Sequence, residues 1–222
     1  MISNFEAVIL GIIQGLTEYL PVSSSGHLVI THHLFGMKEP AIFFDVILHL
    51  GTLLVVIWYY RADIKAALTD TYKGAAQILK GERPSEIMDR LPGFRMAIFV
   101  ILGSIPTGII GIGFRHQFEE MFASTQLVGV MLVITGLLLF TTRFVTDKKE
   151  NEKRITWWIA LAVGLAQGLA ITPGISRSGA TIAVAILLGV EREMAARLSF
   201  FLLIPALTGA ILISLNHASM DV

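Results

Sequence analysis

The sequence contains no cysteine and few charged residues. The absence of cysteine from its 222 residues excludes disulfides and thiolate metal sites. Charged residues make up 15% of the chain, whereas soluble domains carry about 25%. The formal net charge is zero, so the protein has no overall electrostatic attraction to nucleic acid. These absences argue against a disulfide-stabilised protein, a thiolate metalloprotein and a nucleic-acid-binding protein.

Hydrophobic residues, in contrast, account for 54% of the chain, and the mean hydropathy is +0.71. Because so apolar a chain has too little polar surface to face water, we expect lipid around it. Crossing a bilayer takes about 20 apolar residues. Segments that reach or approach this length are residues 42–60, 96–114, 125–145 and 196–216. The N-terminus has no basic segment and no small-residue cleavage site, so we expect its first helix to be retained.

Two other apolar segments are interrupted by a polar turn that contains proline and glycine. In the first, residues 5–20 are followed by the turn 21–26 and by a short apolar stretch, 27–35. In the second, the corresponding parts are residues 156–171, 172–179 and 180–190. Each is predicted to form two half-helices. Hydrocarbon tolerates such a break only where the turn is buried in protein or lines a wet cavity.

The two interrupted segments are copies of one another. With a shift of 153, seven of sixteen positions are identical between residues 11–26 and 164–179. Three spans separate the copies, and because this number is odd, the copies should enter the membrane from opposite sides. The sequence therefore predicts an all-α, polytopic membrane helical bundle with two inverted-topology repeats, each containing a broken re-entrant helix pair. The single transmembrane domain, 1–222, divides into repeats at about 1–60 and 155–222, joined by linking spans within 96–145.

The connecting loops differ in basic residues. Lysine and arginine number seven in residues 61–95, five in 143–154 and one in 115–124. Since these residues are in excess on the cytoplasmic side, the first two loops are predicted to lie inside and the third outside. Residues 72–92 have mixed charge, which favours a solvated, partly helical loop.

The copies differ at the positions that carry chemistry. Glu18 aligns with Ile171, Ser24 with Arg177, and His27 with Ala180. One copy thus supplies an acid, hydroxyls and an imidazole, while the other supplies a guanidinium and further hydroxyls. We expect half-helices to begin near residues 27 and 180 and to direct backbone N–H groups at the point where the turns meet. Such a point suits an anion, and above all phosphate.

Acidic and imidazole side chains inside apolar helices need partners. Gln14 and Glu18 are four residues apart and share a helix face. They form either a structural pair or a functional one, with the carboxylate as a general base or as a ligand of Mg²⁺ or Ca²⁺. Asp45 and His49 show the same spacing, and either face the same cavity or pair with each other.

The serines and the arginine of the turns also have two interpretations. Ser23, Ser24 and Ser25 either cap the following half-helix or include a nucleophile, with His27 or Glu18 as its base. Arg177 either binds phosphate oxygens, which a guanidinium contacts in pairs, or forms a structural salt bridge. These two roles of the arginine are compatible. The hydroxyls around it belong to Ser176, Ser178 and Thr181.

Three motifs strongly resemble the signatures of the bacterial undecaprenyl-diphosphatases, the bacitracin-resistance family. They are Gln14-Gly-Leu-Thr-Glu18, Pro21-Val-Ser-Ser-Ser-Gly-His27 and Pro173-Gly-Ile-Ser-Arg-Ser-Gly-Ala-Thr181. Residues 44–51 and 105–111 are also similar to family segments, so the resemblance covers essentially the whole chain. It implies an enzyme of the bacterial inner membrane that converts undecaprenyl diphosphate to undecaprenyl phosphate and so recycles the cell-wall lipid carrier.

The resemblance also implies roles for individual residues. Catalysis falls on Glu18, Ser24, His27 and Arg177. The residues implied to contact the prenyl diphosphate are Gln14, Ser23, Ser25, Ser176, Ser178 and Thr181. A divalent cation, Mg²⁺ or Ca²⁺, is expected, with Glu18 and Gln14 as candidate ligands. Whether serine, histidine or water attacks phosphorus stays open, and a homodimer in the lipid membrane is a further expectation.

One departure and three alternatives accompany this interpretation. Family members usually continue for one or two more helices, so we expect this chain to be a truncation or a short variant. The type-2 phosphatidic-acid phosphatases require Ser-Arg-x5-His, and Ala183 takes the place of that histidine, so this class is rejected. A lipid-phosphate transporter or flippase competes, because broken helices in inverted repeats are typical of transporters. A non-catalytic membrane scaffold is the third alternative.

Overall fold

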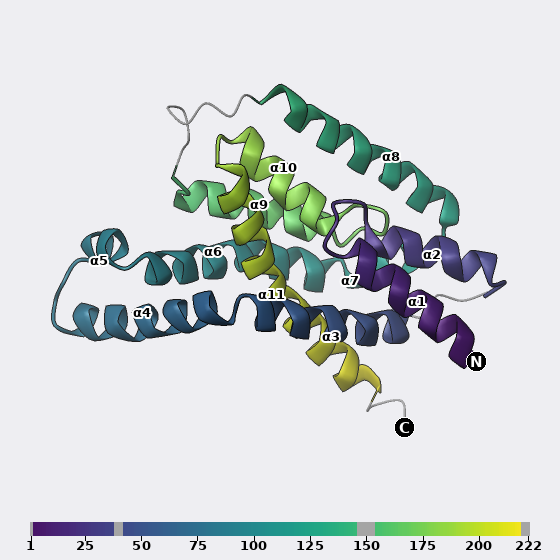
Figure 1. The fold of residues 1–222 in the computed structure, drawn as a ribbon, viewed down its shortest axis with the longest axis horizontal. Helices are drawn as coiled ribbons and strands as arrows, with labels where there is room; N and C mark the ends of the chain where they lie inside the picture. The colour runs from purple at the N-terminus through teal and green to yellow at the C-terminus, as the bar shows by residue number, and fades with distance from the viewer. Residues whose placement is uncertain (1, 38–41, 146–153, 219–222) are drawn as a thin grey trace.

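The chain folds into an all-helical bundle in this computed structural model, which describes residues 2–37, 42–145 and 154–218 (Figure 1). No strand occurs in these three ranges. The helices are α1 (Asn4–Thr17), α2 (Ser24–Leu34), α3 (Ile42–Tyr59), α4 (Arg61–Leu79), α5 (Pro84–Arg90), α6 (Pro92–Gly113), α7 (Arg115–Met121), α8 (Thr125–Thr141), the short 3₁₀ turn η1 (Thr142–Phe144), α9 (Trp157–Leu169), α10 (Arg177–Leu187) and α11 (Arg192–Ala218). The predicted fold class, an all-α multi-pass membrane bundle, is confirmed.

Helices α6 and α11, and α8 together with η1, are each long and apolar enough to cross a membrane, and α3 with α4 forms a further candidate that bends by 72°. Large apolar side chains point outward from these helices: Ile101, Ile109, Val133 and Leu212 are all more than half exposed. An outward apolar surface is what contact with lipid requires. Each of the four predicted spans therefore corresponds to a helix.

Residues 72–92 are partly helical and mostly exposed, as predicted, with the end of α4, the helix α5 and the start of α6 in this range. Helix α4 continues to Leu79 and packs along the start of α6, where a Cβ on Gly74 would lie 2.7 Å from the Phe94 ring. The Gly93 amide also donates to Asp70 at 3.0 Å. The mixed charge of this segment therefore does not prevent α4 from packing closely against α6. Of the predicted basic loop 143–154, residues 146–153 lie outside the described residues.

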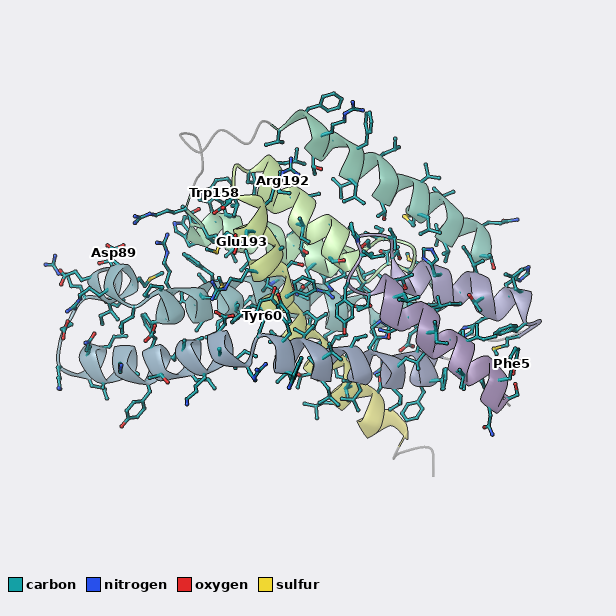
Figure 2. The ribbon with its side chains drawn as sticks, viewed as in Figure 1. Phe5, Tyr60, Asp89, Trp158, Arg192 and Glu193 are labelled. Carbon is teal, nitrogen blue, oxygen red and sulfur yellow. The ribbon has the colours of Figure 1, made fainter. Side chains whose placement is uncertain are left out.

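The sequence repeat is also a repeat of helices. Adding 153 to the bounds of α2, 24 and 34, gives 177 and 187, the bounds of α10. Adding 153 to 4 and 17 gives 157 and 170, while α9 spans Trp157–Leu169. Figure 2 shows Phe5, at the start of α1, and Trp158, at the start of α9, toward opposite ends of the molecule. This arrangement is compatible with inverted repeats, whose orientation in the membrane stays a prediction.

The second half-helices begin three residues earlier than predicted. The Ser23 hydroxyl accepts from the Gly26 amide at 3.2 Å, and the Ser176 hydroxyl accepts from the Gly179 amide at 3.0 Å. Both serines are therefore N-caps, which satisfy amides that the first turn leaves without a partner. As a result, Ser24 and Arg177 are the first residues of α2 and α10, and not turn residues before them.

The two turns lie against each other in the middle of the bundle (Figure 1). A Cβ on Gly26 would lie 3.2 Å from the Cα of Gly174. The Ser178 hydroxyl donates to the Leu20 carbonyl at 3.3 Å, across the same contact. Thr135 of α8 fixes the second turn, since its hydroxyl donates to the Gly174 carbonyl at 3.0 Å. Segments some 150 residues apart are thus held in backbone contact.

The second repeat is anchored on α6. A Cβ on Gly164 would lie 2.0 Å from the Gly103 carbonyl oxygen, so only glycine allows α9 and α6 to approach this closely. The Thr107 hydroxyl donates to the Gly164 carbonyl at 2.8 Å. The surrounding core includes the fully buried Ile159 and Leu198. The packing of α9 against α6 thus fixes the position of the turn that follows α9.

Gly174 should be intolerant of a side chain. Its φ of +92° lies in the left-handed region, and a Cβ would lie 2.5 Å from the Val128 carbonyl oxygen. We predict that Gly174→Ala destabilises the protein by about 2 kcal/mol or more, through backbone strain and overlap. Thermal unfolding in detergent micelles measures the effect as a lower Tm.

The matched control is Gly129→Ala, in α8, where a Cβ would meet nothing within 4 Å. This control should leave Tm unchanged or raise it, because alanine is the better helix former. Equal Tm values for the two variants would contradict the assigned turn geometry.

Candidate active site

A cavity of about 740 Å³ opens where the two turns meet. Helices α3, α6, α7 and α11 complete its walls. The polar lining includes Glu18, Ser24, Asp45, His49 and Arg177. Much of the remaining lining is apolar, with side chains such as Phe43, Ile112, Phe118, Phe122, Leu203, Leu207 and Ile211. The cavity therefore has a charged group of side chains and an extensive hydrocarbon surface.

The Glu18 side chain makes polar contacts with residues of both repeats. Its Oε1 accepts from Arg177 Nη2 at 2.8 Å, and its Oε2 accepts from Ser24 Oγ at 2.5 Å. The Nε2 of His49 lies 3.3 Å from the same Oε2. The carboxylate is thus contacted from α2, α3 and α10 while its side chain is only 6% exposed. The predicted convergence of the two turns into one polar pocket is confirmed.

The guanidinium of Arg177 is held on one side and open on the other. Nη2 donates to Glu18, and Nη1 donates to the Ser199 carbonyl at 3.3 Å. A guanidinium has five N–H donors, so these two bonds leave donors available to an anion in the cavity. The side chain is 17% exposed and lines the cavity. The predicted salt bridge therefore exists, and it is compatible with phosphate binding.

Ser24 and His27 lie on the same helix, α2, but their side chains have different partners. Ser24 is buried, lines the cavity and donates its hydroxyl to Glu18. His27 is not among the described residues that line the cavity, and its Nδ1 lies 2.8 Å from the Ser23 carbonyl oxygen. The Ser24 hydroxyl therefore contacts Glu18, whereas His27 contacts the carbonyl of Ser23, whose φ is +64°.

The other serines of the turns form two matching pairs. The hydroxyls of Ser23 and Ser25 are 3.3 Å apart, and those of Ser176 and Ser178 are also 3.3 Å apart. All four residues line the cavity. In each pair the first hydroxyl caps its helix, and the second hydroxyl of the later pair, on Ser178, donates to the Leu20 carbonyl.

Gln14 and Thr181 lie behind the cavity wall in the described structure. Gln14 is buried and donates from its amide to the Thr52 hydroxyl at 3.1 Å. Thr181 is fully buried, with its hydroxyl 2.9 Å from the Arg177 carbonyl and 2.7 Å from the Ser199 hydroxyl. Neither residue is among those that line the cavity. Thr181 contacts the backbone of Arg177, which does line the cavity, whereas Gln14 is connected to the lining residue His49 only through Thr52.

The polar side chains do not form a ready metal site. Within the described ranges, no group of three or more histidines, aspartates and glutamates is close enough to hold a metal ion. Both oxygens of Glu18 already have partners, and the amide nitrogen of Gln14 is directed at Thr52. The expected role of Gln14 and Glu18 as cation ligands stays a prediction.

Of the two interpretations of Asp45 and His49, the structure favours the shared cavity. Both side chains line it, and His49 contacts Glu18. Asp45 is buried, and its Oδ1 lies 3.4 Å from the Nε2 of His32. The spacing of polar residues in an apolar helix indicated a function, but the neighbour of each could not be read from the sequence.

Glu18 and Arg177 should depend on each other for stability. Removing one partner of a buried ion pair leaves a buried charge uncompensated. We predict that Glu18→Gln and Arg177→Met show a coupling energy of about 1–3 kcal/mol in a double-mutant cycle of unfolding free energies. Unfolding in mixed micelles with denaturant is the measurement.

The control cycle uses the exposed pair of Glu82 and Arg90. Its coupling should stay below about 1 kcal/mol, as surface ion pairs do. Additive effects of Glu18→Gln and Arg177→Met would show that the two residues do not meet.

Comparison with known proteins places this geometry in a family. Residues 7–221 match the family model described as bacitracin resistance protein BacA. The chain is similar to the undecaprenyl-diphosphatase of Desulfatibacillum aliphaticivorans, with 49% identity over 96% of this chain and 78% of the relative. The undecaprenyl-diphosphatase of Desulfosudis oleivorans is 47% identical over 97% of this chain and 80% of its own length. That of Korarchaeum cryptofilum is 42% identical over 95% and 76%. With a match over nearly all of its length, the chain belongs to the bacitracin resistance protein BacA family.

Proposed function

We propose that this protein hydrolyses undecaprenyl diphosphate to undecaprenyl phosphate and inorganic phosphate. The observation that carries the proposal is the carboxylate of Glu18, which joins the hydroxyl of Ser24 to the guanidinium of Arg177 beside one cavity. Three relatives bear the name of this activity. The setting is the bacterial inner membrane, where the reaction recycles the lipid carrier of cell-wall synthesis. The homodimer stays a prediction, which sizing in detergent would test.

The lining of the cavity suits an amphiphilic substrate. The diphosphate would lie near Arg177, where free guanidinium donors and the first amides of α10 face an anion. The apolar walls would hold the adjoining isoprene units. A volume of about 740 Å³ lies within the usual range for pockets that bind small molecules, so the rest of the prenyl chain would extend into lipid.

In the proposed reaction, Ser24 Oγ transfers its proton to Glu18 and attacks the terminal phosphorus. The bond from that phosphorus to the bridging oxygen breaks, and undecaprenyl phosphate leaves with the electron pair. Water then attacks the phosphoserine, the serine oxygen recovers a proton from Glu18, and inorganic phosphate leaves with the remaining proton passing to solvent. Arg177 stabilises charge on the transferring group throughout.

Direct attack by water is the alternative chemical route. In that case Glu18 deprotonates the water, and Ser24 only orients the carboxylate and the phosphate. The 2.5 Å contact between Ser24 Oγ and Glu18 Oε2 favours the serine route, because nucleophile and base are already in hydrogen-bond contact. For His27 we propose support of the strained Ser23, through the bond to its carbonyl.

We further propose that a divalent cation, Mg²⁺ or Ca²⁺, enters as part of the substrate. Mg²⁺ in phosphate chemistry is commonly held by one or two carboxylates together with substrate oxygens. The described residues offer no preformed group of ligands, whereas a diphosphate brings several oxygens of its own. The cation would then enter as a counter-ion of the diphosphate, and would not bind to the protein without substrate.

Ser24→Ala and Arg177→Ala should each lower the rate of phosphate release by about 100-fold or more, the scale expected for a lost nucleophile or transition-state donor. The assay is release of inorganic phosphate from a prenyl diphosphate in detergent. Matched controls are Ser104→Ala, on the cavity wall but bonded to the Val100 carbonyl, and Arg143→Ala, which is exposed. Both controls should stay within about threefold of wild type.

This assay also separates the proposed hydrolysis from a transporter of lipid phosphates. The approach of two broken helix pairs from opposite ends is compatible with a transporter fold (Figure 2). Detergent abolishes transport across a membrane but leaves hydrolysis intact. A wild-type protein that binds prenyl diphosphate in detergent without releasing phosphate would therefore favour transport over catalysis.

A chelator should suppress phosphate release, and added Mg²⁺ or Ca²⁺ should restore it. Because the cation is proposed to arrive with the diphosphate, titration calorimetry should detect no stoichiometric Mg²⁺ binding to protein alone. Tight binding of the ion without substrate would contradict this part of the proposal, and so would undiminished turnover in excess chelator.

A further inference from the structure

His49 has a fixed orientation between two acceptors. Its Nδ1 lies 2.6 Å from the Asp45 carbonyl oxygen, and its Nε2 lies 3.3 Å from Glu18 Oε2. A carbonyl oxygen can only accept a hydrogen bond, so Nδ1 carries a proton. On the other side, the imidazole and the carboxylate attract each other only when a proton lies between them. The position of the ring therefore holds its Nε2 beside Glu18 Oε2, at the edge of the cavity.

The substrate creates a competition for Arg177. In the described structure its Nη2 is bound to Glu18 at 2.8 Å. A diphosphate in the cavity would draw the guanidinium toward its own oxygens. Glu18, with a side chain only 6% exposed, would then be a buried carboxylate beside a polyanion. An isolated buried charge of this kind is strongly unfavourable.

We propose that His49 is a positioning residue that becomes the main partner of Glu18 when the substrate takes Arg177. This inference rests on the proposed function. The contact with His49 compensates the negative charge of the Glu18 carboxylate. The Arg177 guanidinium is then free to bind the diphosphate. The contact with His49 also keeps Oε2 in place for the proton of Ser24, which binds the same oxygen.

The surroundings of His49 fit a partner that stays in place. The Thr52 hydroxyl donates to the His49 carbonyl at 3.0 Å and accepts from Gln14 at 3.1 Å, which ties α3 to α1. Tyr19 donates to the Thr52 carbonyl at 3.3 Å. Since α1 ends at the residue before Glu18, these bonds hold the imidazole and the carboxylate on one rigid unit. Arg177, by contrast, comes from the other repeat.

The test is a double-mutant cycle on binding, with turnover kept out of the measurement. The ligand is a farnesyl methylenediphosphonate, which cannot be hydrolysed at the bridge. His49→Ala should weaken its binding by about tenfold or more, because Arg177 stays on Glu18. In a Glu18→Gln background no carboxylate competes for the guanidinium, so His49→Ala should change binding by less than about twofold. His49→Gln, which keeps an N–H donor, should recover most of the affinity.

Turnover adds a second readout. His49→Ala should raise KM as well as lower kcat, since both substrate binding and the orientation of the base suffer. The matched control is His116→Ala, which removes the imidazole of a histidine–glutamate pair on the surface, where the two side chains are 80% and 69% exposed. This control should leave both constants unchanged.

The outcomes separate the two proposals. Equal losses of affinity from His49→Ala in both backgrounds, or no loss in either, would overturn the role of His49, even if wild type hydrolyses prenyl diphosphates. A folded wild-type protein that releases no phosphate would instead overturn the proposed function.

Discussion

The rest of this structure depends on one constraint, which is that the charged carboxylate of Glu18 is buried inside a membrane protein. Glu18 would be strongly unfavourable in hydrocarbon without partners. Its partners are Arg177, Ser24 and His49, which come from three helices and from both repeats. The ion pair forms only if the two broken turns are brought together. The site is therefore complete only when both repeats are folded against each other.

Small residues allow the two turns to meet. Gly26 and Gly174 let one turn lie against the other, and Gly164 lets α9 approach α6. The serine caps then begin α2 and α10 so that Ser24 and Arg177 are the first residues of their helices. At that position a side chain lies beside free backbone amides, which favour an anion. The same geometry that buries the turns thus forms the proposed phosphate site.

Much of this arrangement could be predicted from the sequence, because the repeat preserved glycine, serine and glutamine at matching positions. The spans, the broken pairs and the pocket around Ser24 and Arg177 followed from that pattern and from hydropathy. For the partner of Ser24 the sequence offered two candidates, His27 and Glu18, and did not decide between them. His27 was close in sequence, but its ring turns back to the Ser23 carbonyl, whereas Glu18 reaches the serine from the end of α1. Contacts of that kind depend on rotamers and on the angle between helices, which spacing along a chain does not specify.

The start of α10 and the packing of α4 were missed for similar reasons. Ser176 caps its helix while its own amide donates to Thr135 of α8, which is distant in sequence. For α4, Gly74 accepts the Phe94 ring, a contact that its mixed charge concealed. Tertiary neighbours decided both cases.

The central claim is that one diphosphate is bound by both repeats at once. An experimentally determined structure with farnesyl methylenediphosphonate bound tests it most directly. The account predicts that the Arg177 guanidinium and the Ser24 hydroxyl both lie within hydrogen-bond distance of the diphosphonate, about 3 Å, with Glu18 still beside the serine. A ligand bound to one turn alone, with the other beyond the reach of its phosphorus groups, would contradict it.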